Sequence, residues 1–149
     1  MNNRKFKTIL PITVAVLIAL IFIHSMLPQS KSMVESEWVR SFVKKLFFGR
    51  EFQMIDYLHI RKTAHFVEYF ILGVFSARLY TVFNKKYSFV NLYSLLTSSL
   101  LVGLLDETLQ LFTNRTSQIK DVWLDFSGSL CGIIIFFAVY AIIKNRSRK

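Results

Sequence analysis

The sequence predicts an all-α membrane protein with four transmembrane helices and one amphipathic helix at the outer interface. Hydrophobic residues make up 53% of the 149 positions, and the mean hydropathy is +0.42. Four apolar runs are each long enough to cross about 30 Å of hydrocarbon at about 1.5 Å per residue. They cover residues 8–27, 63–83, 89–112 and 122–143. We therefore expect one membrane domain over residues 1–149 and no separate soluble catalytic domain.

The first run follows Arg4, Lys5 and Lys7, an arrangement that is also typical of a signal peptide. The apolar stretch, however, spans about 20 residues, which is enough for a transmembrane helix. No small-x-small cleavage site follows Leu27. We expect an uncleaved first span.

The segment between the first two runs contains the predicted amphipathic helix, over residues 33–48. Its apolar positions recur at helical spacing: Val34, Trp38, Phe42 and Leu46. Ser32 and Glu35 have the spacing of a capping box, and Gly49 follows the last apolar residue. The pattern favours a lid anchored in the lipid head groups, with a partner-binding groove as the alternative.

The charges predict the topology. If the N-terminus is cytoplasmic, ten basic residues and no acidic one lie on that side: Arg4, Lys5, Lys7, Arg78, Lys85, Lys86, Lys144, Arg146, Arg148 and Lys149. The positive-inside rule then places both termini of a multi-pass cell-membrane protein in the cytoplasm. The whole net charge of +10 is explained in this way. The lipid bilayer is thus an expected partner and nucleic acid is not.

Polar residues inside the spans are the most informative feature, because an ionisable side chain at a helix centre costs about 2.5 to 3.5 kcal/mol on insertion scales. In the second span, Lys62, His65 and Tyr69 lie on one helical stripe with Glu68 at its edge. One face of the third span holds Ser99, Gly103, Asp106, Glu107, Gln110 and Asn114.

The fourth span carries Asp121 and Asp125 at i, i+4, and Gly128 and Gly132 extend that face as a strip that permits close helix packing. The first span can add His24 and Ser25 at its outer end. We therefore expect polar faces of the spans to meet just below the outer surface.

Two interpretations of this cluster stay open. In the structural one, Lys62 and Arg115 neutralise Asp106 and Glu107, and His65 satisfies a carboxylate. In the functional one, the cluster is a working site, since apolar residues could replace a purely structural network at little cost.

Two sequence blocks resemble the VanZ-like family of small integral membrane proteins. The first is Lys62-Thr-Ala-His65-Phe-Val-Glu68-Tyr69-Phe-Ile-Leu-Gly73. The second is Asp106-Glu107-Thr-Leu-Gln110-Leu-Phe112, then Arg115, then Asp121-Val-Trp-Leu-Asp125-Phe-Ser-Gly128 leading into Gly132. The resemblance implies a four-span bacterial membrane protein from a family named for a protein that raises resistance to teicoplanin. Asp125 stands where the family often has Asn.

The resemblance and the polar faces together favour binding of a lipid-linked envelope molecule or a lipid-tailed glycopeptide antibiotic of the teicoplanin class. Lys62, Arg115 and Lys120 would hold phosphate or carboxylate, while Trp38 and Tyr69 would line an apolar portal. The expected ligand-binding residues are Lys62, His65, Glu68, Tyr69, Asp106, Glu107, Gln110, Arg115, Asp121 and Asp125.

The alternative is a membrane-embedded hydrolase or transferase acting on a lipid-linked envelope substrate. Its candidate catalytic residues are His65, Glu68, Asp106 and Glu107, with a base and its orienting carboxylate on nearly the same helix face. We expect no cofactor and assign no metal, although His65, Glu68, Asp106 and Asp121 offer suitable donors, because no compact metal motif is present. A transporter is disfavoured, since the polar groups stop in the outer half.

Overall fold

The computed structural model describes residues 3–26, 57–84, 88–113 and 118–147. These residues form four α-helices, α1 (Asn3–Ser25), α3 (Tyr57–Phe83), α4 (Phe89–Leu111) and α5 (Ile119–Arg146), and no strand. Each is long and apolar enough to cross a membrane. The all-α class and the four spans are thereby confirmed. The amphipathic helix expected over residues 33–48 lies outside the described residues.

The helix ends differ from the apolar runs that predicted them. Helix α3 begins at Tyr57 rather than at residue 63, and α1 ends at Ser25 rather than at residue 27. Hydropathy detects only the part of a helix that is apolar, whereas backbone hydrogen bonding continues through polar turns. In α3 this extension brings Arg61 and Lys62 onto the helix.

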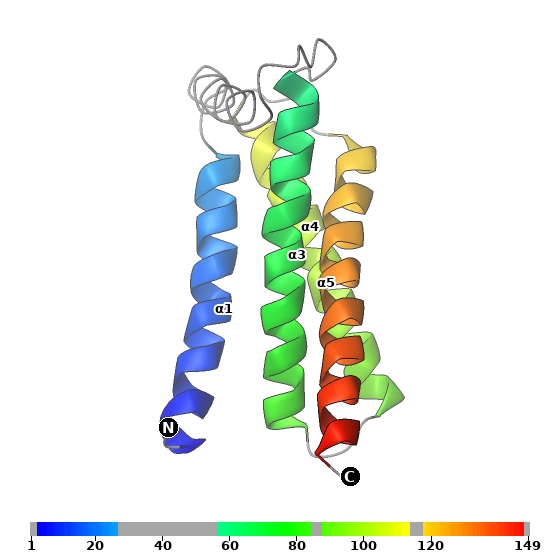
Figure 1. Cartoon of the computed structure of the whole chain (residues 1–149). Helices are drawn as coiled ribbons and strands as arrows, with labels where there is room; N and C mark the ends of the chain where they lie inside the picture. Colours follow the sequence, from blue (N-terminus) through cyan, green and yellow to red (C-terminus); the bar gives the residue numbers. More distant parts are fainter. Residues whose placement is uncertain (1–2, 27–56, 85–87, 114–117, 148–149) are drawn as a thin grey trace, which may run out of the picture.

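Figure 1 shows the four helices running alternately up and down, with both termini at the same end. Helix α3 packs most extensively against α5, while α1 contacts α3 and α4. Helix α4 crosses behind α3 and α5 and ends near the end of α1 (Figure 1). This alternation brings the C-terminal ends of α1 and α4 to the same end of the bundle as the N-terminal ends of α3 and α5.

Glycines allow α3 and α5 to pack backbone against backbone. A Cβ atom added at Gly73 would lie 2.2 Å from the carbonyl oxygen of Ser129, and one added at Gly132 would lie 2.2 Å from that of Phe70. At Gly128 the corresponding distance to the Phe66 carbonyl oxygen is 2.6 Å. The strip expected from Gly128 and Gly132 is confirmed as a helix-packing surface, and its partner is α3.

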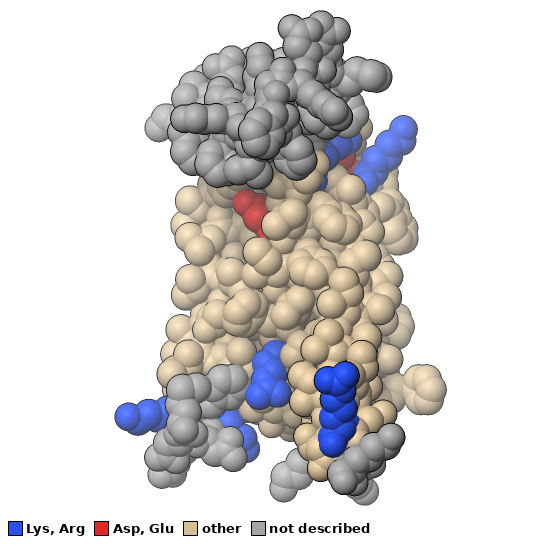
Figure 2. Space-filling view, viewed as in Figure 1, with Lys and Arg blue, Asp and Glu red and all other residues tan. Residues whose placement is uncertain are grey.

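The outer surface of the bundle is apolar where the interior is polar. On α4 the buried residues include Ser99, Asp106 and Gln110, whereas Leu104 and Leu105 are about half exposed. This pattern is the reverse of that in a soluble helix, and it suits a helix that turns its leucines toward lipid and its polar groups toward neighbouring helices. Figure 2 shows a largely uncharged middle on the visible face.

Candidate polar site

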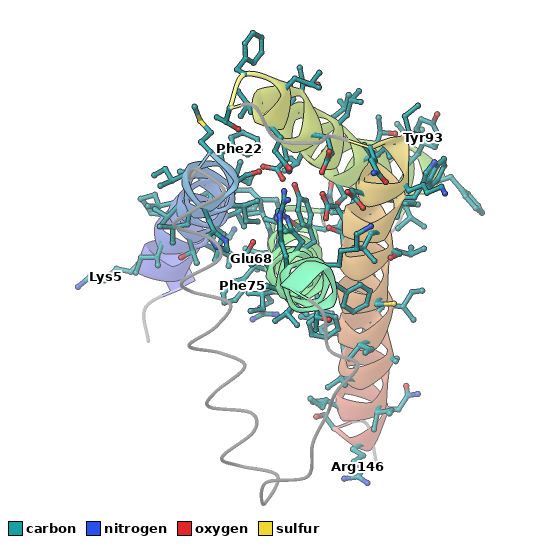
Figure 3. The ribbon with its side chains drawn as sticks, turned by 90° about the horizontal axis from the view of Figure 1, so that it is seen from above. Lys5, Phe22, Glu68, Phe75, Tyr93 and Arg146 are labelled. Atoms are coloured by element: carbon teal, nitrogen blue, oxygen red, sulfur yellow. The ribbon has the colours of Figure 1, made fainter. Side chains whose placement is uncertain are left out.

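Polar side chains of all four helices gather at the end of the bundle away from the termini. Seen from that end, oxygen and nitrogen atoms crowd the space between α1, α3, α4 and the start of α5, and Glu68 lies beside α1 (Figure 3). Acidic side chains are visible only toward this end in the space-filling view (Figure 2). The helix faces deduced from the sequence therefore do meet in one volume.

Gln110 of α4 forms hydrogen bonds with three other side chains of the site, and only 1% of Gln110 is exposed. Its Nε2 atom donates to Asp106 Oδ2 at 3.3 Å and to Glu107 Oε1 at 3.0 Å. Its Oε1 atom accepts a hydrogen bond from the Arg61 guanidinium on α3. The other Glu107 oxygen accepts from the backbone N–H of Gln118 at 3.2 Å, at the start of α5. The Gln110 amide thus links α4 to α3, and Glu107 links the same cluster to the start of α5.

Lys62 pairs with Asp121, whose Oδ1 atom lies 2.7 Å from Nζ. The structural interpretation had Lys62 neutralising Asp106 and Glu107, and this was wrong for Lys62. Asp121 lies in the first turn of α5, where it faces α3, while Asp106 and Glu107 lie deeper and each accept a hydrogen bond from Gln110. Arg115, the other base in that interpretation, lies outside the described residues.

The Lys62–Asp121 ion pair is expected to contribute only a small stabilisation, because the two side chains are 44% and 21% exposed. A double-mutant cycle with Lys62→Met and Asp121→Asn should give a coupling energy of about 0.2 to 1 kcal/mol, measured from thermal unfolding in detergent. Lys120→Met is the matched control, because Lys120 is exposed beside Asp121. A coupling far above this range would mean that the pair is shielded from solvent.

Glu68 turns toward α1 rather than toward the other carboxylates. Its Oε1 atom lies 2.7 Å from Nδ1 of His24, and the rings of His24 and His65 stack with centroids 6.2 Å apart.

Tyr69, expected to line an apolar portal, is fully buried, so it does not face the lipid. Its ring packs toward Gly103 of α4, which leaves it inside the bundle.

The centre of the site is formed by His65, Asp106 and Asp125, one residue from each of α3, α4 and α5. They are 6%, 0% and 1% exposed. His65 Nδ1 lies 3.8 Å from Asp106 Oδ2 and 3.9 Å from Asp125 Oδ1. These distances are too long for hydrogen bonds. Ser25 of α1 is fully buried and lies near Asp106, so α1 also borders this centre.

A cavity of about 220 Å³ opens beside this centre. It is lined by Arg61, Lys62, His65, Glu107, Gln118, Asp121, Leu124 and Asp125. The cavity therefore offers two bases, an imidazole and three carboxylates to a ligand. Such a mixture of donors and acceptors suits a small head group that carries both charge and hydroxyl groups.

Of the residues that the sequence singled out, the structure brings together Lys62, His65, Glu68, Tyr69, Asp106, Glu107, Gln110, Asp121 and Asp125. It also adds Arg61, which the sequence reasoning placed in the outer segment. A usable signal was present, since Arg61 precedes His65 by four residues and therefore shares its helix face. Lys120 is exposed and does not line the cavity.

The family model VanZ/LLP1 matches residues 10–142, nearly the whole chain, including α3 and α4 in full and most of α1 and α5. The chain belongs to the VanZ/LLP1 family. The expected resemblance is thus confirmed over a longer stretch than the two motif blocks, and the match includes the first helix. Neither a curated protein nor a solved structure matches the chain significantly.

For this VanZ/LLP1 protein, the family match covers every residue of the polar centre and of the cavity lining. The two motif blocks that carried the resemblance are also the two parts of the chain that meet there: the first lies on α3, and the second runs from α4 into α5.

Proposed function

We propose that this VanZ-like protein binds the polar head of a lipid-linked envelope molecule, or of a lipid-tailed glycopeptide antibiotic of the teicoplanin class, at the outer leaflet. The observation that carries the proposal is the 220 Å³ cavity with Arg61 and Lys62 at its lining, in a bundle whose outside is apolar. A lipid-anchored molecule reaches such a site by diffusing in the membrane, with its tail among the exposed leucines.

The size of the cavity means that a phosphate or one sugar of the ligand would enter it, and that the rest of a glycopeptide would stay outside. Pockets that enclose drug-sized ligands span about 300 to 1,000 Å³, and this cavity is smaller. A phosphate or one sugar fits within it. Arg61 and Lys62 suit phosphate or carboxylate oxygens, and the nearby carboxylates suit hydroxyl or ammonium groups. The outer-leaflet location follows from the expected topology, with both termini cytoplasmic.

The proposal is tested by drug susceptibility in cells that lack the protein and are complemented with wild type, Asp106→Asn or Glu107→Gln at matched membrane levels. Wild type is expected to protect against teicoplanin more than against vancomycin, which lacks the acyl tail, and both variants are expected to lose most of that protection. Thr108→Val is the control, because Thr108 adjoins Glu107 but is exposed and bonds only to its own helix.

Equal protection by Asp106→Asn and Glu107→Gln would show that these acids only pack the bundle. If wild type protects against neither drug, the antibiotic is not the ligand. Direct binding of undecaprenyl-phosphate lipids to the purified protein, with Arg61→Gln and Lys62→Gln as expected losses, then decides whether a lipid-linked head group is bound. Failure of that binding as well would overturn the proposal.

A second candidate function is catalysis on the same lipid-linked class of substrate. The observation that favours it is the buried His65 beside Asp106 at the edge of the cavity, an arrangement in which an imidazole acts as a general base and a carboxylate orients it. Release of inorganic phosphate from a lipid pyrophosphate by purified protein, abolished in His65→Gln, separates this candidate from simple binding. Stoichiometric binding without turnover favours the first.

A further inference from the structure

The buried centre of the site presents an electrostatic problem. Asp106 and Asp125 are 0% and 1% exposed, and no Lys or Arg among the described residues forms an ion pair with either of them. Gln110 Nε2 donates a hydrogen bond to Asp106 Oδ2, while Asp106 Oδ1 has no hydrogen-bond partner in the described part of the chain. Asp125 Oδ2 has no hydrogen-bond partner in the described part of the chain, and neither has the hydroxyl of the fully buried Tyr69 nearby. A buried charged group without a partner costs several kcal/mol.

The geometry of the centre suits a cation. One imidazole nitrogen and one oxygen from each carboxylate lie within 4.8 Å of one another. An ion in the plane of the three atoms and equally far from them lies about 2.2 to 2.5 Å from each, against about 2.0 to 2.2 Å for nitrogen and oxygen ligands of Zn²⁺. Side-chain rotations that bring the three atoms closer together complete the ligand shell.

We infer that His65, Asp106 and Asp125 form a divalent transition-metal site, with Zn²⁺ as the best match and Mn²⁺ as the second. The set of one imidazole and two carboxylates is typical of these ions. Two carboxylates balance the charge of one divalent ion. The hydrogen bond from Gln110 Nε2 to Asp106 is the kind of outer contact that orients a metal-binding carboxylate.

The metal set differs from the one that the sequence offered, which was His65, Glu68, Asp106 and Asp121. Glu68 is held by His24 on α1, and Asp121 is held by Lys62. Asp125 takes their place because it lies one turn deeper on α5 than Asp121.

The fourth coordination position faces the cavity. His65 and Asp125 both line the cavity that also contains Arg61 and Lys62. With three protein ligands, a Zn²⁺ ion keeps a position for water or for an oxygen of a bound molecule. The metal would bind whether or not the proposed function is correct, because its three ligands are side chains of the protein and not atoms of a bound lipid or antibiotic.

The test uses full-length protein with an affinity tag that contains no histidine, purified in detergent, stripped with a chelator and dialysed against Zn²⁺ or Mn²⁺. Elemental analysis is expected to find about one ion per chain, and isothermal titration gives the affinity. Asp125→Asn and His65→Gln are expected to weaken Zn²⁺ binding by more than about tenfold. Added Zn²⁺ is expected to raise the Tm of wild type and to leave the Tm of both variants unchanged.

Asp121→Asn is the matched control, because it removes the same charge from the same helix one turn away, outside the proposed ligand set. Its Zn²⁺ affinity should stay within about threefold of wild type. Equal losses in Asp121→Asn and Asp125→Asn would overturn the site as assigned. The absence of bound Zn²⁺ and Mn²⁺ in folded wild type at micromolar concentrations would overturn it outright, even if a variant fails to fold.

Discussion

Gly132→Ala is expected to lower the Tm of the detergent-purified protein by about 6 to 12 °C, which corresponds to about 3 kcal/mol for a chain of this size. The new Cβ atom would lie 2.2 Å from the Phe70 carbonyl oxygen and 3.0 Å from the Val74 nitrogen. Both are backbone atoms of α3, so no rotamer change relieves the clash. The helices must separate, which also weakens the hydrogen bond from the Ser129 hydroxyl to the Tyr69 carbonyl.

Gly103→Ala is the matched control for this substitution. Gly103 is also a buried glycine in a transmembrane helix, but a Cβ atom there would lie 3.4 Å from Asp125 Cβ, an ordinary van der Waals contact. Its Tm should stay within about 2 °C of wild type. If both substitutions lower the Tm equally, the loss of stability comes from replacing any buried glycine of these helices and not from the close contact between α3 and α5.

Gln110→Met is expected to destabilise the fold by about 3 to 5 kcal/mol. Methionine keeps the length of the side chain but removes the two hydrogen bonds to Asp106 and Glu107 and the acceptor for Arg61. Both carboxylates are almost completely buried, so water does not replace the lost donors. The measurement is thermal or denaturant unfolding of the purified protein, followed by circular dichroism.

Gln118→Met is the control for Gln110→Met. Gln118 is exposed, and it contacts Glu107 through its backbone N–H, which the substitution retains. Its stability should therefore match wild type within about 0.5 kcal/mol. A Gln110→Met protein as stable as the control would show that the buried acids find other hydrogen-bond partners. The hydrogen bonds of Gln110 would then not be needed for the stability of the fold.

The number of spans and the end at which polar groups gather could both be predicted from the sequence. Hydropathy is a local property, so a run such as residues 122–143 is recognisable without knowing its neighbours. Helical periodicity likewise assigns Asp106, Glu107 and Gln110 to one face. The strip of Gly128 and Gly132 could be recognised for the same reason.

The pairing of charges across helices was decided only by the tertiary structure. Whether Lys62 meets Asp121 or Asp106 depends on the rotation and tilt of α3 relative to α4 and α5, and the glycine contacts hold the backbones of α3 and α5 close together. Packing between helices likewise places Glu68 of α3 beside His24 of α1 and Asp125 of α5 beside His65 of α3. Periodicity along one helix gives the direction of a side chain but not the identity of its neighbour, because that neighbour belongs to another helix.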